Sequence, residues 1–174
     1  MRKKRLLQLT AALLCAVILS ACGGTPADAD YTCTVSISCA TIIDNMDQCA
    51  ESKKELVPAD GVILPPTEVA FAEGESAFDV LQRVCRDNGI HLESKFTPVY
   101  NSAYIQGIHN IYEFDVGKLS GWMYAVNDWF PNYGCSLYQV QDGDVIRWVY
   151  TCDLGADVGG GQAAGDGQQE GAST

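Results

Sequence analysis

The chain has 174 residues, of which 22 are acidic, 11 are basic and eight are cysteine. The first 21 residues hold four of the basic residues and no acidic ones, so the remainder has seven basic residues against 22 acidic ones, a formal charge of −15. Such a surface repels nucleic acid and anionic lipid headgroups, which excludes the usual nucleic-acid-binding classes.

The N-terminus has the form of a bacterial lipoprotein signal. Four basic residues at positions 2–5 precede an apolar stretch from Leu6 to Leu19, and small residues then lead to a cysteine in LSAC. We expect residues 1–21 to be removed and Cys22 to carry a diacylglyceryl lipid. The alternatives are a plain secreted protein and a short membrane anchor, although the apolar stretch is short for a transmembrane helix. The expected location is extracytoplasmic, lipid-anchored to the bacterial cell membrane.

Composition divides the rest of the chain into three parts. Residues 22–31 are small and polar, as in a flexible tether. Residues 154–174 are rich in Gly, Gln and Ala and bury too little apolar surface to offset the entropy of ordering, so they predict a disordered tail. The folded domain is predicted at residues 32–153, long enough for one sizeable core.

The N-terminal part of this domain predicts two strands separated by a helix. Alternation in CTVSISC places four residues on one buried strand face: Cys33, Val35, Ile37 and Cys39. Apolar residues then recur at helical spacing, which predicts a short helix within residues 41–52. Residues 67–72 predict a second strand, and the pair Pro65–Pro66 indicates an edge segment before it.

The segment SAFDVLQRVCRDNG predicts the main helix. Ser76 suits the N-cap, Asp79 favours the positive end of the helix dipole, and Gly89 suits the left-handed position after the last turn. The apolar stripe comprises Ala77, Val80, Leu81, Val84 and Cys85.

Four short strands are predicted after this helix, at residues 91–96, 104–108, 121–126 and 137–140. An Asp-Gly turn at residues 141–144 predicts a hairpin between the last of these and the segment DVIRWVYTC. Few helices with many short strands predict an α+β domain.

Six cysteines remain after Cys15 and Cys22: Cys33, Cys39, Cys49, Cys85, Cys135 and Cys152. An even number outside the cytoplasm favours disulfides, with 15 pairings open, and the spacings lack the CxxC pairs of a zinc site. The chain contains no hydrolase, phosphate-loop, dinucleotide or zinc-protease motif. An enzyme would require a free thiol paired with His91 or His109, so we predict a non-catalytic protein without a cofactor or metal.

Aromatic residues are concentrated in LSGWMYAVNDWFPNYGC, which contains the candidate ligand-binding residues. Trp122 and Tyr124 share one strand face, where the alternative interpretation is ordinary core packing. Rigid aromatic rings in a loop beside proline and asparagine suit ligand contact better. The candidates in this loop are Asn127, Trp129, Phe130 and Tyr133.

The segments GWMYAVND, YQVQDGDVIRWVY and SAFDVLQRV resemble the DUF4430 family, which is similar to the C-terminal domain of transcobalamin and intrinsic factor. The resemblance covers about residues 33–152. It implies a β-grasp-like fold, a mixed sheet crossed by one main helix, with the first and last strands adjacent and parallel at the centre. It also leads us to expect glycine at position 128, so Asp128 predicts a longer or differently shaped loop.

The resemblance also implies a disulfide pattern and a ligand. It brings Cys33 and Cys39 near Cys152, with Cys135 on a neighbouring strand, which implies two bridges among these four and a third between Cys49 and Cys85. In transcobalamin the related domain covers one face of cobalamin beside a helical barrel, for which this chain has no residues left. Cobalamin is therefore a candidate ligand, although the absence of the helical barrel weakens the case for it.

The leading hypothesis is a disulfide-stapled surface lipoprotein that binds a soluble small molecule, such as a corrinoid, or a cell-surface component. The N-terminal lipid would attach the protein to the membrane, and nucleic acid is not an expected partner. The alternative is a structural or adhesion module that contacts other proteins through a flat apolar patch, in which case the aromatic loop would not line a concave pocket.

Overall fold

The computed structural model describes Pro26 and residues 29–160, so the expected signal peptide and the lipidation site Cys22 lie outside the described residues. The elements in chain order are β1 (Tyr31–Ser38), the 3₁₀ helices η2 (Ala40–Asn45) and η3 (Glu51–Leu56), β2 (Val62–Phe71), α2 (Ala77–Asp87), β3 (Leu92–Thr97), β4 (Ser102–Ile108), β5 (Ile111–Tyr112), β6 (Gly121–Val126), β7 (Val145–Thr151) and the 3₁₀ helix η4 (Ala156–Val158). Within the described part of the chain, no helix is long and apolar enough to span a membrane.

A four-stranded mixed sheet forms the base of the domain, in the order β2-β1-β7-β6. β1 and β7 are its central strands and run parallel, from the pair Thr34↔Val145 to the pair Ser38↔Val149, while the outer pairings are antiparallel. The predicted parallel pairing of the first and last strands is therefore confirmed. The alternation in β1 is confirmed as well, because Val35, Ile37 and Cys39 are fully buried and the polar residues between them are not.

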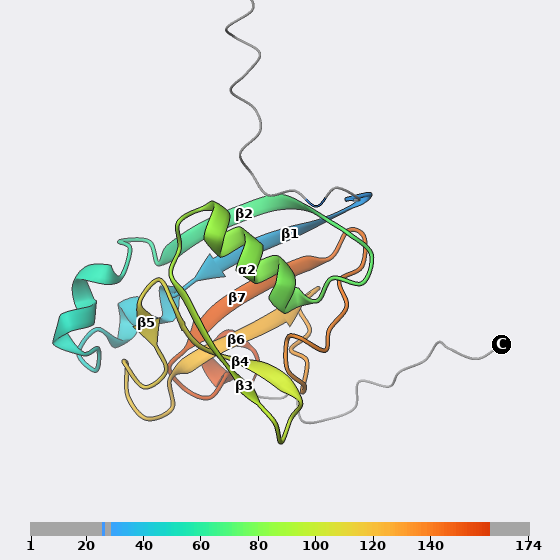
Figure 1. The fold of residues 1–174 in the computed structure, drawn as a ribbon. Helices are drawn as coiled ribbons and strands as arrows, with labels where there is room; N and C mark the ends of the chain where they lie inside the picture. Colours follow the sequence, from blue (N-terminus) through green and yellow to red (C-terminus); the bar gives the residue numbers. More distant parts are fainter. Residues whose placement is uncertain (1–25, 27–28, 161–174) are drawn as a thin grey trace, which may run out of the picture.

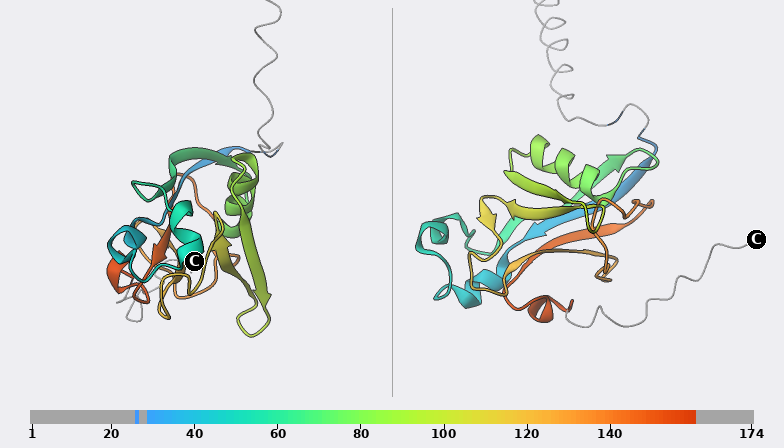
Figure 2. Two further views of the ribbon diagram at one scale, coloured as in Figure 1. Left: turned by 90° about the vertical axis from the view of Figure 1, so that its left-hand side faces the viewer. Right: turned by 60° about the horizontal axis from the view of Figure 1, so that its bottom comes forward.

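α2 and a second, antiparallel sheet of order β3-β4-β5 cover the same face of this base (Figures 1 and 2). β4 brings Ala103, Ile105 and Ile108 into the core beneath this layer. The base sheet contributes its largest buried side chains, Trp148 and Tyr150, from β7. The predicted α+β class, a mixed sheet crossed by one main helix, is therefore confirmed.

The ends of α2 follow the sequence prediction. The Ser76 hydroxyl accepts a hydrogen bond from the backbone N–H of Asp79, and the Asp79 carboxylate accepts one from the backbone N–H of Ser76. This reciprocal pair satisfies two of the free donors at the start of the helix. Asn88 is the C-cap, and Gly89 follows with a φ of +65°, in the left-handed region that glycine adopts without steric cost.

The pair Pro65–Pro66 lies inside β2, which begins five residues earlier than the sequence indicated. β2 is an edge strand, and its register against β1 shifts between Val35↔Thr67 and Ile37↔Leu64, so the prolines occupy a bulge. Proline lacks an N–H and is tolerated where the ladder is interrupted. The expected helix within residues 41–52 consists instead of two 3₁₀ helices, one ending at Asn45 and one starting at Glu51.

The predicted strand at residues 137–140 is wrong, and with it the Asp-Gly hairpin. The backbone N–H of Ala77 donates to Tyr138 O, and that of Val140 donates to Glu75 O, so this segment runs against the start of α2. The segment thus provides a hydrogen-bond acceptor for a free backbone N–H at the start of α2. Local strand propensity does not reveal such a partner. The partner of β7 in the hairpin is β6.

The folded domain continues beyond the predicted boundary at residue 153. η4 packs under the base sheet, where Val158 contacts a small second core of Ala125, Phe130 and Val149. The Asp157 carboxylate accepts hydrogen bonds from the Thr151 hydroxyl and from the backbone N–H of Cys152 at 2.7 Å. One carboxylate and one valine thus tie residues 154–160 of the predicted tail to the sheet, and residues 161–174 of that tail lie outside the described residues.

Among the described residues all six cysteines are free thiols, so the predicted disulfides are not formed. Cys33 is the third residue of β1 and Cys39 follows its last residue, so the two lie about 20 Å apart at roughly 3.3 Å per residue. Bridged Cα atoms are under about 7 Å apart, which excludes a bridge between these two. Cys135 does not lie on a strand beside β7; its thiol contacts Ala103 O of the second sheet at 3.7 Å. Burial raises the pKa of Cys33, Cys39, Cys85 and Cys135 to about 12.

These thiols predict a specific pattern of alkylation. In the native protein at pH 8, iodoacetamide should label Cys152, which is only partly buried, and leave the other five intact, because all five are buried. For Cys33, Cys39, Cys85 and Cys135, a pKa near 12 also leaves only about one thiol in 10⁴ ionised. Unfolding in guanidinium without reductant should expose all six, as peptide mapping by mass spectrometry would show. Cys152→Ser is the control that removes the native label. Failure to label unfolded protein until reductant is added would contradict this result.

Candidate functional site

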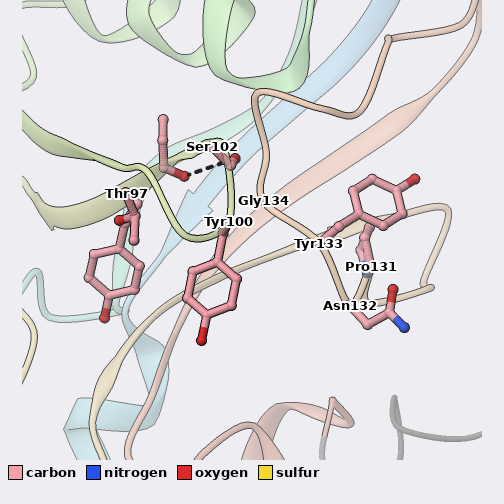
Figure 3. A pocket seen from close by; sticks show the side chains of 9 residues that line it. Thr97, Tyr100, Ser102, Pro131, Asn132, Tyr133 and Gly134 are labelled. Carbon is pink, nitrogen blue, oxygen red and sulfur yellow. Dashed lines mark hydrogen bonds between the residues drawn. The ribbon is translucent and has the colours of Figure 1, made fainter.

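An open cavity of about 560 Å³ separates the tip of the β3–β4 hairpin from the loop that follows β6. Tyr100 lies on the hairpin side, and Pro131, Asn132 and Tyr133 lie on the loop side (Figure 3). The full lining is Thr97, Tyr100, Ser102, Ala103, Tyr104, Pro131, Asn132, Tyr133 and Gly134. We call this space the outer cavity. Its volume lies within the range of small-molecule sites.

A smaller cavity of about 190 Å³ adjoins the outer one. The two share four lining residues, namely Ala103, Tyr104, Pro131 and Gly134. The remaining lining comes mainly from β6 and β7, including Trp122, Tyr124 and Trp148. We call this space the inner cavity, and the two together the groove. The groove therefore leads from an exposed aromatic rim to the aromatic core of the base sheet.

Close contacts between β4 and the loop hold the two walls in place. The hydroxyls of Ser102 and Ser136 are 2.8 Å apart, and Ser136 Oγ accepts a hydrogen bond from the backbone N–H of Ala103. Gly134 lies so close to β4 that a Cβ there would come within 1.8 Å of Ser102 Oγ. Glycine at position 134 thus allows the loop to approach the strand on which one wall is built.

The loop itself starts from a tight turn. Val126 and Trp129 exchange both backbone hydrogen bonds, at 2.8 and 2.9 Å, around Asn127 and Asp128, whose φ angles are +50° and +66°. Two central residues of positive φ form a primed hairpin turn, and asparagine and aspartate tolerate that region better than most residues. The expectation of a longer loop at Asp128 is therefore wrong.

The structure separates the six candidate residues into groups. Tyr133 lines the outer cavity, and Trp122 and Tyr124 line the inner one. Trp129 lies beside the groove, 42% exposed, with its ring edge-on to Tyr133 at a centroid distance of 5.9 Å.

The two other candidates face away from the groove. Phe130 is 4% exposed and packs in the second core on the opposite face of the base sheet. Asn127 Nδ2 donates to the Asp144 carboxylate at 2.8 Å, and its Oδ1 accepts from the backbone N–H of Val145. The side chain of Asn127 thus ties the β6 turn to the start of β7.

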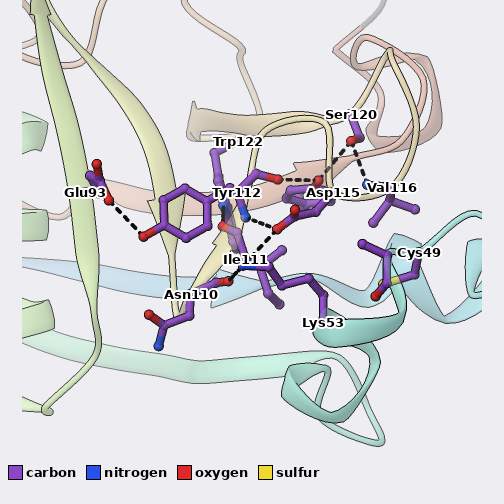
Figure 4. A network of polar contacts seen from close by, with 12 residues as sticks. Cys49, Lys53, Glu93, Asn110, Ile111, Tyr112, Asp115, Val116, Ser120 and Trp122 are labelled. Carbon is purple, nitrogen blue, oxygen red and sulfur yellow. Dashed lines mark hydrogen bonds and ion pairs between the residues drawn. The ribbon is translucent and has the colours of Figure 1, made fainter.

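Most N–H and O–H groups of the core aromatic residues donate hydrogen bonds within the protein. Trp122 Nε1 donates to Ile111 O at 2.8 Å, and the Tyr150 hydroxyl donates to Tyr112 O at 2.7 Å. The segment that accepts these bonds is held by Lys53, which donates to Asn110 O, forms an ion pair with Asp115 and lies over the ring of Tyr112 (Figure 4). This network fixes β5 against the base sheet and supports the inner end of the groove.

The groove is uncharged. Among the described residues, none of those lining either cavity carries an ionised side chain at neutral pH. Burial, and then the hydrogen bond to Glu113, raise the pKa of Tyr104 to about 12, and burial raises the pKa of Tyr124 above its ordinary value. Both phenols therefore stay neutral over the physiological range. In the described part of the chain no cluster of His, Cys, Asp or Glu is arranged to hold a metal ion.

Sequence reasoning missed the hairpin side of the groove, above all Tyr100 and Tyr104. Tyr100 follows Pro98 closely and precedes Asn101, the same local pattern that singled out the loop after β6. It is 73% exposed at the tip of the hairpin. An aromatic residue between proline and asparagine is the sequence signal that marks this position as well.

Residues 74–152 match the DUF4430 family, described as a domain of unknown function. The predicted resemblance is confirmed for this region, which is shorter than the predicted range because the match begins just before α2. The match includes the hairpin, the loop after β6 and every groove residue. No curated protein matches the chain.

Solved structures extend the DUF4430 comparison to the fold. Haptocorrin in complex with Cbi, a protein of the transcobalamin family, has a TM-score of 0.52 at 12% identity. The match covers 71% of this chain but only 25% of haptocorrin, so this chain corresponds to about a quarter of that protein. A protein from Ruminococcus gnavus ATCC 29149, described as a candidate metal-binding protein, has a TM-score of 0.41 at 15% identity, covering 70% of this chain and 97% of its own. The haptocorrin match supports the predicted similarity in fold.

The approach of Gly134 to β4 predicts a rescue experiment. Gly134→Ala should lower stability by about 1–3 kcal/mol, because the added methyl group collides with Ser102 and forces the groove walls apart. Replacing Ser102 by glycine in the same chain removes the colliding atoms, so the double variant should lose less than the sum of the two single changes. Urea unfolding monitored by tryptophan fluorescence measures the three values. Strict additivity would show that the contact does not constrain the loop.

Proposed function

We propose that this protein is a cell-surface lipoprotein whose non-catalytic domain binds a neutral soluble molecule in the groove. The observation that carries the proposal is the groove itself, a concave site with uncharged aromatic walls on two separate elements. Predominantly apolar lining with a few polar groups is typical of small-molecule sites. On a chain with twice as many acidic as basic residues, an uncharged cavity also favours a neutral ligand over an anionic one.

The chemistry of the groove supports binding over catalysis. Burial raises the pKa of the nearby Cys135 thiol to about 12, which makes it a poor nucleophile at neutral pH. The hydroxyl of Ser102 is shared with Ser136 and is not paired with a histidine. A nucleophile activated by a base and held by a third group is the arrangement that hydrolytic chemistry needs, and these contacts do not supply it.

A corrinoid is one candidate ligand. Its support is the fold similarity to haptocorrin, whose structure contains Cbi, together with the open groove and its uncharged aromatic walls. The match covers about a quarter of haptocorrin, so the activity of that whole protein comes to this chain only as a proposal.

A second candidate function, contact with another cell-surface protein, is favoured by the exposed apolar side chains around the hairpin tip. Phe96, Val99 and Tyr100 are 60%, 86% and 73% exposed. Exposed apolar groups of this kind often mark contact surfaces. Val99 separates the two functions, because it is close to Tyr100 in the chain yet does not line the groove.

Titration with cobalamin tests the candidate ligand and the site together. If a corrinoid binds, Tyr100→Ala and Tyr133→Ala should each weaken binding by about 5- to 30-fold, because each removes an aromatic contact of about 1–2 kcal/mol. Absorbance and calorimetry measure the affinity, and Val99→Ala is the matched control that should leave it unchanged. No binding at millimolar cobalamin removes the corrinoid. Loss of binding to a surface partner on Val99→Ala would instead favour the protein-contact function.

The lipid anchor predicts a change of location. With Cys22 replaced by serine there is no thiol to receive the lipid, so the protein should move from the membrane fraction to the soluble extracytoplasmic fraction. Fractionation and detergent phase partitioning measure this, and Cys15→Ser, which changes a cysteine inside the signal, is the control. A serine variant that stays in the detergent phase would contradict the lipoprotein assignment.

A further inference from the structure

β6 is an edge strand of the base sheet and lacks the features that usually protect such an edge (Figure 1). The opposite edge strand, β2, is interrupted by Pro65–Pro66 and by two shifts of register. The edge strand of the second sheet, β3, contains Glu93 and Lys95 and a shift of register of its own. β6 pairs with β7 in unbroken register, and its sequence GWMYAV holds no proline and no charged residue. A regular, uncharged edge is a template for pairing with another strand.

The register of β6 shows which backbone groups lie on its free side. The backbone N–H of Asn127 donates to Val145 O at 2.9 Å, so this pair and every second pair before it are hydrogen-bonded to β7. In an antiparallel ladder the residues between these pairs direct their N–H and C=O groups away from the partner strand. Of these residues, Val126 uses its outward groups in the tight turn that follows. In the described part of the chain, those of Trp122 and Tyr124 make no hydrogen bond to another protein group.

The free side of β6 borders the inner cavity. Consecutive residues of a strand point to opposite faces of the sheet, so a cavity lined by three in succession lies along the edge of the strand. The inner cavity is lined by Trp122, Met123 and Tyr124. Met123 packs against the second core, whereas the two aromatic residues belong to the main core on the other face. The unpaired backbone groups of β6 therefore line a space that a ligand can enter.

A third cavity, of about 350 Å³, continues the groove along the same edge. It shares Tyr104, Trp122 and Met123 with the inner cavity, and its lining includes Gly121, the first residue of β6. Tyr104 lines all three cavities. Further exposed apolar side chains line the third cavity, namely Phe114, Leu119 and Leu154. The three cavities together form an elongated site that follows β6.

Resting on the proposed binding role of the groove, we propose that its ligand is an extended peptide segment of a partner protein, which adds to β6 as a fifth strand of the base sheet. The outward backbone groups of Trp122 and Tyr124 then exchange hydrogen bonds with the peptide backbone. An extended peptide presents donors and acceptors at the spacing of a strand, and strand addition is a recurrent mode of peptide recognition.

The walls of the site select the side chains of that segment. Alternate side chains of an added strand point to the same face as Trp122 and Tyr124, toward the uncharged aromatic lining, so every second residue of the peptide should be apolar. The Tyr104 hydroxyl donates to the Glu113 carboxylate at 2.6 Å, which places a negative charge close to all three cavities and disfavours acidic residues. Lys118, in the third cavity, is the single charged side chain of the described lining. β4 and the loop after β6 border the same cavity, and these walls admit one extended strand more readily than the layered edge of a second copy.

Peptides blocked along one edge test this assignment on the full chain labelled with ¹⁵N. The parent probes are the acetylated and amidated peptides KVTVTVTK, KLTLTLTK and KYTYTYTK. Each parent has two isomers, one N-methylated at its three apolar residues and the other at its three threonines. The two isomers have the same composition, but each keeps its central N–H groups on one edge only.

One isomer of the parent that binds should retain the affinity of that parent, and the other should bind about tenfold more weakly, because its hydrogen bonds to β6 are lost. Which isomer is tolerated reports whether the added strand runs parallel or antiparallel to β6. The parent should shift the backbone amide signals of Trp122 and Tyr124 downfield. The amides of Met123 and Ala125 should move less, because they are already bonded to β7.

A pair of variants checks the position of the peptide. Tyr104→Ala removes a ring that lines all three cavities and should weaken binding of the parent about fivefold. Val99→Ala is the matched control, because Val99 is exposed but lines none of the three cavities, and it should leave the affinity unchanged.

Three results would overturn strand addition. Equal affinity of the two isomers, with groove signals shifting, removes the role of the β6 backbone and leaves the groove as a binding site. If no peptide shifts a groove signal at millimolar concentration, the peptide is excluded, and titration with cobalamin shows separately whether the groove binds at all. A dimer in sedimentation whose Trp122 and Tyr124 amides do not respond to peptide would make a second copy the occupant of the edge.

Discussion

The parallel pairing of β1 with β7 is the constraint on which the rest of the structure depends. It joins residues more than 100 positions apart, from Thr34 beside Val145 to Ser38 beside Val149, at the centre of the base sheet. A parallel pair cannot be closed by a tight turn, so the whole of the intervening chain becomes the crossover. α2, the second sheet and the groove are all parts of that crossover, packed on one face of the two central strands.

The start of β7 is held by a single buried carboxylate, and this anchor also shapes the groove. Asp144 accepts hydrogen bonds from the Asn127 amide, the Tyr138 hydroxyl and the backbone N–H of Gln141, each at 2.8 Å. Its own backbone carbonyl accepts from the N–H of Thr34 in β1. One side chain thereby links the central strands, the turn after β6 and the segment that runs against α2. The loop wall of the groove lies between these fixed points, so the fold itself holds the groove open.

The aromatic residues fall into two groups, according to whether their N–H or O–H group has a hydrogen-bond acceptor within the protein. Trp122 and Tyr150 have their donors satisfied by backbone carbonyls of the β5 segment, so they stabilise the core and hold the inner end of the groove. Trp148 lies beside them without an acceptor, and Tyr100 and Tyr133 expose their rings at the rim. Tyrosine therefore packs with a bonded hydroxyl at position 150 and exposes its ring at positions 100 and 133. The difference comes from the partner that the tertiary structure brings within reach.

The sequence by itself determined the features set by local chemistry. These are the buried face of β1 by alternation, the extent of α2 by its cap residues, the strand at 121–126, and the aromatic segment that contributes one wall of the groove. Only the tertiary structure decided that Phe130 faces the opposite side, that residues 137–140 satisfy a helix terminus, and that Tyr100 completes the site from another element. It also decided the state of the thiols, all six of which are free in the described part of the chain. Periodicity and capping act over a few residues, whereas the partner of a side chain across a cavity depends on how the crossover packs, and no local pattern encodes that.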